Sequence, residues 1–170
     1  MDTPIRQPFL ERKSQNLQIQ KAVQPDNGDS SVFLPNSFVV LSGGLLVAVA
    51  TAGVLVYGWS ADKSHLSTDH APDALYGQNH WPFDPTDAQF VMNITDNSGH
   101  IGQAAGAPQL SAAVVGTSYG IYKNTGGYQM VNISDTTNKL FTVMALYPNQ
   151  ALTDYNGRVI VKVIDTCIQA

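Results

Sequence analysis

The sequence predicts a single-pass membrane protein, with one transmembrane α-helix followed by a small, mainly-β extramembrane domain. The stretch from Phe38 to Trp59, FVVLSGGLLVAVATAGVLVYGW, contains no ionisable residue. Residues 108–170 instead contain short segments with the period of two that is typical of strands. The chain therefore divides into four parts: a polar tail (1–36), the helix (37–59), an irregular Pro/Gly/His-rich segment (60–107) and the β-rich domain (108–170).

Phe38 to Trp59 has the length and composition of a membrane span. At about 1.5 Å per helical residue it reaches about 33 Å, against a hydrocarbon core of about 30 Å. No charged residue or histidine occurs from Ser30 through Ala61, whereas an amphipathic surface helix has a polar face. Without an ionisable residue the helix offers no proton relay or ion site, so we expect it to be an anchor.

One face of this helix is predicted to pack against another membrane helix. Gly44, Ala48 and Ala52 recur every four residues, a spacing of small residues that lets a second helix approach closely. Gly and Ala are also common in membrane spans for other reasons. Tyr57 and Trp59 lie at one end, where amphipathic rings settle at the membrane interface. The expected partners are thus the lipid bilayer and other membrane protein subunits.

Two other readings of the apolar stretch are weaker. A cleavable signal peptide would use the small-x-small pattern at 48–50, but a long polar stretch precedes its apolar region and cleavage would leave an apolar N-terminus. A type IV prepilin would need a glutamate at the position of Ser42, and the only glutamate in the chain is Glu11. We therefore expect an uncleaved anchor and assign no family.

Charge on the two sides of the stretch predicts the orientation. Residues 1–36 contain four basic and four acidic residues, and residues 60–170 contain five basic residues against nine aspartates. Because basic residues favour the cytoplasmic side, the N-terminus is expected inside and the C-terminal domain outside, in a periplasmic, lumenal or extracellular location. The polar tail is expected to be disordered unless a partner or the membrane surface orders it.

The irregular segment 60–107 contains one expected strand, at 88–95, and one aromatic anchor. Trp81 and Phe83, interleaved with proline, are expected to pack on this domain or to contact a partner protein. The four histidines all fall in this segment: His65, His70, His80 and His100. Their spacing does not match a zinc site and no cysteine supports them, so we expect no bound metal.

The β-rich end is expected to form an antiparallel meander, as a sandwich or partly closed barrel. The segment Asn124-Thr125-Gly126-Gly127 is a hairpin signal between two strands. The expected strands are 118–123, 128–134, 139–147 and 158–168. In the last of them one face, formed by three valines, is predicted to be buried: Val159, Val161 and Val163. The single cysteine, Cys167, excludes an intrachain disulfide.

No catalytic or cofactor motif appears in the sequence. It contains no nucleophile elbow, phosphate loop, dinucleotide fingerprint, CxxC or HExxH. The acidic balance outside the tail and the absence of a basic cluster argue against nucleic-acid binding. Asn93-Ile94-Thr95 and Asn132-Ile133-Ser134 match the N-glycosylation triplet, a pattern that is common by chance.

These observations predict a non-catalytic, membrane-anchored structural or accessory subunit of a larger assembly. Candidate assemblies are a cell-envelope secretion or pilus machine, a bioenergetic complex and a membrane-containing virion. The alternative is a membrane-tethered β domain that binds a ligand or carbohydrate through aromatic side chains. The candidates for such a site are Trp81, Tyr119, Tyr122 and Tyr128.

Overall fold

The computed structural model describes residues 2–6, 8–12, 20–22, 34–42, 45–50, 55–60, 78–82 and 88–168. Its strands are β1 (Phe9–Arg12), β2 (Gln20–Ala22), β3 (Phe38–Ser42), β4 (Leu45–Ala48), β5 (Gly58–Ser60), β6 (Gln78–Pro82), β7 (Gln89–Thr95), β8 (Ser118–Lys123), β9 (Gln129–Asn132), β10 (Phe141–Leu146) and β11 (Arg158–Val163). Within the described residues the helical segments are short 3-10 turns: η2 (Gln103–Ala105), η3 (Ala112–Val114) and η4 (Asp165–Cys167).

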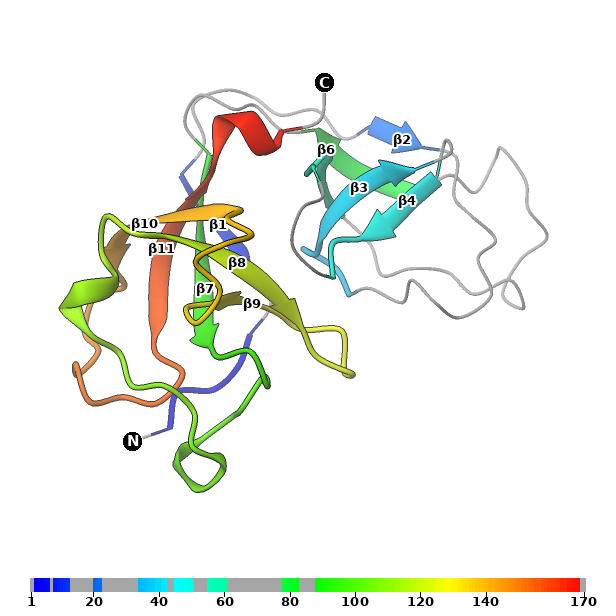
Figure 1. The fold of residues 1–170 in the computed structure, drawn as a ribbon. Helices are drawn as coiled ribbons and strands as arrows, with labels where there is room; N and C mark the ends of the chain where they lie inside the picture. Colours follow the sequence, from blue (N-terminus) through cyan, green and yellow to red (C-terminus); the bar gives the residue numbers. More distant parts are fainter. Residues whose placement is uncertain are drawn as a thin grey trace.

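Strands β7 to β11 close into a five-stranded barrel (Figure 1). The order is β7-β11-β10-β8-β9, and a short parallel pairing of Ile94 with Val131 and of Thr95 with Asn132 joins β9 back to β7. Because β9 contacts only the C-terminal end of β7, the other end has room for a further strand. β1 pairs there, with Phe9 opposite Val91.

A second, antiparallel sheet lies beside the barrel (Figure 1). Its order is β2-β6-β5-β3-β4, so β2 and β4 are its edge strands within the part of the chain that the structure describes. Strands β3 and β4 form a hairpin in which Ser42 pairs with Leu45. The two residues between these partners are Gly43 and Gly44, which lie outside the described residues.

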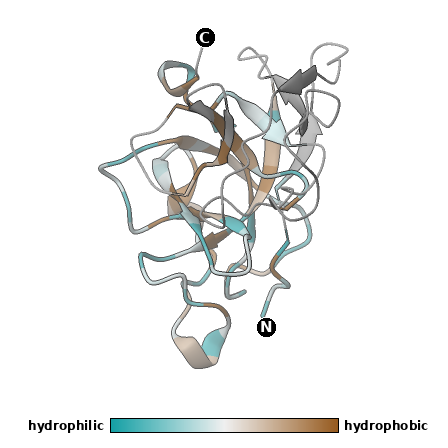
Figure 2. Cartoon of the chain, turned by 90° about the vertical axis from the view of Figure 1, so that its right-hand side faces the viewer, coloured by the Kyte–Doolittle hydropathy of each residue, from teal (hydrophilic) through white to brown (hydrophobic). Residues whose placement is uncertain are grey.

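The two sheets share one hydrophobic core. Phe38 of β3 packs between two barrel side chains, with ring centroids 4.9 Å from Phe90 and 5.0 Å from Phe141. Trp59 of β5 contacts Phe90 edge-on at 5.1 Å. Val49, just after β4, is fully buried in the same cluster. Figure 2 shows this distribution, with hydrophobic colouring along the inner strands and hydrophilic colouring in the loops.

The prediction of a transmembrane helix at 37–59 is wrong. The described part of this stretch forms β3, β4 and β5, and Val56 bridges to Ile168. No helix among the described residues combines the length and hydropathy that a membrane crossing requires. Four of its described residues, Phe38, Val49, Val56 and Trp59, lie in the core that the two sheets share, and strands buried in this way read as continuous apolar runs.

The predicted single-pass topology, with its inside tail and outside domain, is wrong for the same reason. β1 and β2, from the N-terminal region, pair with β7 and β6. Segments predicted to lie on opposite sides of a membrane therefore belong to the same two sheets. The predicted single-pass membrane location is overturned together with the helix.

In residues 88–170, strands occur near the positions expected from the sequence, but their order in the sheet differs from the expected one. β8 occupies 118–123 as predicted, and the three valines of β11 are buried. The order is not a meander, however, because β11 pairs with β7 and β9 closes on β7 in parallel. Periodicity in a sequence identifies strands, but the partner of each strand depends on contacts between distant residues.

Candidate functional site

The β3–β4 hairpin extends beyond the sheet to which it belongs, and we call its strands, 38–42 and 45–48, the ribbon. Of the residues in the ribbon, only Phe38 and Val39, at its base, pair with β5. From Val40 onward, β3 is paired with β4 alone among the described strands. A two-stranded ribbon has little stability of its own in water, so the attachment of its base to the barrel matters.

The side chain of Gln129 fixes the base of the ribbon to the barrel. Its amide is fully buried, and Oε1 accepts a hydrogen bond from the Phe38 N–H at 2.6 Å. Nε2 donates to the Phe38 carbonyl at 3.0 Å and to the Val49 carbonyl at 2.7 Å. The Val49 N–H also donates to the Phe38 carbonyl. The Gln129 amide therefore binds three backbone groups at the base of the ribbon: the N–H and C=O of Phe38 and the C=O of Val49.

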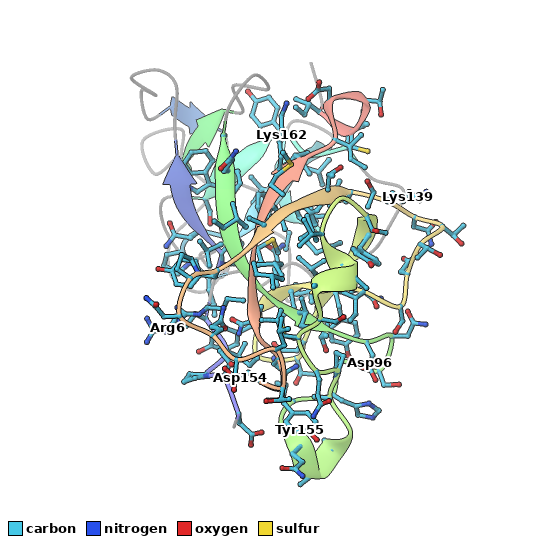
Figure 3. All side chains as sticks on the ribbon, turned by 90° about the vertical axis from the view of Figure 1, so that its left-hand side faces the viewer. Arg6, Asp96, Lys139, Asp154, Tyr155 and Lys162 are labelled. Atoms are coloured by element: carbon cyan, nitrogen blue, oxygen red, sulfur yellow. The ribbon has the colours of Figure 1, made fainter. Side chains whose placement is uncertain are left out.

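A second buried amide holds residues 2–6, the N-terminal strap, against the barrel. Asn93 Oδ1 accepts from the Arg6 N–H at 3.0 Å, and its Nδ2 donates to the Pro4 carbonyl at 3.3 Å. At the end of the strap, Asp2 Oδ1 accepts from the Gln103 N–H at 3.0 Å. Figure 3 shows Arg6 and Asp154 towards the same end of the molecule.

Asn156, in the loop before β11, joins that loop to β7 and to the loop that follows β7. It is fully buried and has a positive φ of 50°. Its Nδ2 donates to the carbonyls of Ile94 and His100, each at 2.9 Å, and its Oδ1 accepts from the Gly102 N–H at 2.7 Å. The Asn156 carbonyl accepts from Asn93 Nδ2 at 2.7 Å. The Asn156 side chain thus binds three backbone groups, and its backbone carbonyl links to the strap through Asn93.

The neighbouring loop is closed by an Asp96–His100 pair. Asp96 Oδ2 lies 2.6 Å from His100 Nδ1, and Oδ1 accepts from the N–H groups of Ser98 and His100. Partial burial would raise the pKa of Asp96, but the backbone and side-chain hydrogen bonds from His100, its charge and the Ser98 N–H outweigh this and hold that pKa below its usual value.

The lowered pKa of Asp96 predicts a pH-dependent contribution to stability. A carboxyl whose pKa is lower in the folded state stabilises the fold above its unfolded pKa of about 3.9, and this contribution is lost as pH falls through the folded pKa. We expect Asp96→Asn to lower the thermal midpoint at pH 7 by about 2–4 °C. The difference from wild type should vanish near pH 2, as measured by circular dichroism. An equal difference at both pH values would contradict an electrostatic origin.

The residues predicted for helix packing and for the membrane interface have other positions. Ala48 lies on β4 and is buried, whereas Gly44 and Ala52 lie outside the described residues. Trp59 is a core residue of β5, and Tyr57 is half-buried next to it. These side chains pack within the protein because the segment is a set of strands.

The predicted partner-contact residues are only partly described. Trp81 lies on β6 with its backbone opposite Trp59, and only its backbone is described. Phe83 lies outside the described residues, so its predicted role stays a prediction.

The structure does not gather the tyrosines of the predicted ligand site into one platform. Tyr119 is a buried core residue. The ring of Tyr122 lies against Gly99, and its hydroxyl donates to the Ser98 carbonyl at 3.3 Å. Tyr128 is 36% exposed beside the turn after β8.

The buried polar groups of the described residues are used mainly to join segments of the fold. Two buried side-chain atoms there have no hydrogen-bond partner: Ser37 Oγ and Arg158 Nε. No group of three or more His, Cys, Asp or Glu side chains with metal-binding geometry occurs in the described ranges. Both glycosylation-triplet asparagines are buried and hydrogen-bonded. Their amides are therefore not accessible in the folded chain.

Sequence reasoning missed the two amides on which these attachments depend, Gln129 and Asn156. A glutamine in a strand gives no signal that its amide faces inward. For Asn156 a signal existed, because Asn156-Gly157 is a turn dipeptide and asparagine tolerates positive φ. Comparison of the chain with protein-family models, with curated proteins and with solved structures found no match to any of them.

Proposed function

We propose that this protein is a non-catalytic structural subunit that acts by binding other protein chains within a larger assembly. The ribbon carries this proposal. It is apolar and uncharged, it is held rigidly at its base by Gln129, and its outer strand β4 is a sheet edge among the described strands. An apolar, uncharged edge strand is a template for pairing with another chain.

The use of polar side chains also supports a structural role. Gln129, Asn93 and Asn156 direct their amides to backbone groups of the protein itself. The Asp96–His100 pair closes its own loop, with both Asp96 oxygens occupied. These groups stabilise attachments between segments, and none of them converges with a nucleophile on a common point.

The mass of the native particle tests the proposal. The full-length chain, isolated gently from the cells that produce it, is weighed by native mass spectrometry and sedimentation velocity. We expect a particle that contains several copies of the 18.3 kDa chain, or this chain with other proteins in fixed stoichiometry. A free 18.3 kDa monomer at every concentration would overturn the proposal.

A further inference from the structure

We propose that the Asn156-Gly157 dipeptide is a deamidation site that is protected in the folded chain and reactive in the unfolded chain, and that its modification prevents refolding. The reaction needs no enzyme, and water is its only co-reactant. The Gly157 nitrogen attacks Cγ of Asn156 and gives up its proton, while the Cγ–Nδ2 bond breaks and Nδ2 leaves as ammonia. Water then opens the cyclic imide, which leaves aspartate or isoaspartate at position 156.

The fold requires both residues of this dipeptide. Asn156 has a φ of 50°, a conformation that asparagine adopts more readily than most residues, and its side chain binds three backbone groups. A Cβ on Gly157 would lie 2.8 Å from Cβ of the buried Leu110, so a larger residue does not fit there. Glycine also leaves the attacking nitrogen unhindered, because it has no side chain. The loop before β11 is therefore built on a pair of residues that is open to this reaction.

In the folded chain, the Asn156 side chain is held away from the reaction by its own hydrogen bonds. Nδ2, the leaving group, donates to the carbonyls of Ile94 and His100, and Oδ1 accepts from the Gly102 N–H. Attack at Cγ would turn the amide and break these bonds. Asn156 is also fully buried, so the water that opens the cyclic imide does not reach it.

The backbone on both sides of the reacting bond is held as well. The Asn156 N–H donates to the Pro108 carbonyl, and the Asn156 carbonyl accepts from Asn93 Nδ2. The Gly157 carbonyl accepts from the Ile94 N–H at 2.9 Å. The Gly157 nitrogen therefore cannot swing towards Cγ while these contacts last. We expect the reaction to wait until this end of the barrel opens.

The product of deamidation does not fit where the asparagine was. Nδ2 of Asn156 lies 2.9 Å from the carbonyl oxygens of both Ile94 and His100. An ionised carboxylate has no hydrogen to donate, so its oxygen would meet two acceptors there, and its charge would be buried away from water. Isoaspartate adds a carbon to the main chain and shifts the loop. A chain that deamidates while unfolded therefore cannot return to the folded state.

The first test compares deamidation of the full-length chain in buffer and in guanidinium chloride at the same mildly alkaline pH. Trypsin cleaves after Lys139 and Arg158 and releases residues 140–158, and fragmentation of this peptide in the mass spectrometer locates the change at Asn156. We expect the folded chain to react at least about 100-fold more slowly than the unfolded chain, because it must open first. Equal rates in the two conditions would overturn the protection.

Two other asparagines act as internal references in the denaturant. Asn27 is also followed by glycine, so it should deamidate at a rate similar to that of Asn156. Asn149 lies in the same tryptic peptide but precedes Gln150, whose side chain hinders the attacking nitrogen, so it should react much more slowly. A rate at Asn156 as low as that at Asn149 would show that the unfolded chain is not reactive at this site.

The second test is refolding by dilution after increasing times in the denaturant. The refolded fraction should retain asparagine at position 156, and the fraction that does not refold should contain the modified chains. Asn156→Gly cannot deamidate at this position, so its refolding yield, relative to its own starting value, should not fall with time. Modified and unmodified chains in equal proportion in the two wild-type fractions would overturn the block to refolding. This comparison decides the point even if Asn156→Gly does not fold.

A pair of aspartate variants reproduces the product directly. Asn156→Asp places the carboxylate at the buried position and should not refold under conditions in which the wild type does. Asn149→Asp adds the same charge in an exposed turn with a similar φ of 64°, and it should refold with the yield of the wild type. A wild-type yield for Asn156→Asp would show that the fold accepts the deamidated chain and would overturn the proposal.

Discussion

Replacing Asn156 with alanine is expected to lower the free energy of unfolding by about 3–5 kcal/mol, because the substitution removes the side-chain partner of two buried backbone groups, each at about 1–3 kcal/mol. These are the carbonyl of Ile94 and the N–H of Gly102, whereas the part-buried carbonyl of His100 keeps a hydrogen bond from Thr95 Oγ1. The positive φ of 50° adds strain for alanine. Urea unfolding, followed by the fluorescence of buried Trp59, measures the loss.

Two companion variants separate the backbone contribution from the hydrogen bonds. Asn156→Gly removes the same hydrogen bonds but accepts the positive φ, so it should be about 1 kcal/mol less destabilising than Asn156→Ala. Asn149 has a similar φ of 64° in an exposed turn. Asn149→Ala should therefore cost only about 1 kcal/mol. Equal losses for Asn156→Ala and Asn149→Ala would show that the buried hydrogen bonds contribute nothing.

Replacing Gln129 with methionine is expected to lower the free energy of unfolding by about 2–4 kcal/mol. Methionine has a similar shape, but it removes the buried hydrogen bonds that Gln129 makes with the Phe38 N–H and the Val49 carbonyl. Because both groups lie at the base of the ribbon, amide exchange at Phe38 and Val49 should accelerate more than exchange within β11. Urea unfolding and hydrogen exchange of the same sample provide the two measurements.

Gln150 provides the matched control for this substitution. Its side-chain amide also makes three hydrogen bonds to backbone, to Tyr147 and to both the N–H and carbonyl of Arg158. It is only half-buried, so water can replace the lost bonds. Gln150→Met should therefore cost about 1 kcal/mol or less. If Gln150→Met lowers the free energy of unfolding as much as Gln129→Met does, then the burial of the Gln129 amide does not explain the effect of that substitution.

The strands from residue 88 onward were predictable because they are local and their signals agree. In 118–123 and 158–163, alternating side chains lie between turn residues, and the hairpin turn closes with the Gly127 N–H bonded to the Asn124 carbonyl. Side-chain alternation and turn chemistry are both short-range properties. The closure of the barrel through Ile94 and Val131 has no such local signal.

The prediction of a helix in the apolar stretch is wrong because it rests on high hydropathy, although the same stretch carries two sequence signals for strands. Valine recurs through it, and β-branched residues favour strands over helices. Gly43-Gly44 between two apolar runs is also a hairpin signal. A strand that is buried on both sides and a membrane helix present the same hydropathy. Only the length of each uninterrupted run distinguishes them, and here the glycines divide the run.

The position of the N-terminal strap has a consequence for synthesis on the ribosome. The Thr3 N–H donates to the Tyr155 carbonyl, and Asp2 forms a parallel bridge with the same residue. At about 5–20 residues per second, the first residues wait about 8–30 s before their partners emerge. During the first part of this interval, the apolar strands from residue 38 onward have been made, but β7 and Gln129, which later cover them, have not. We therefore expect nascent chains to depend on a chaperone that shields apolar segments until β7 and Gln129 have emerged.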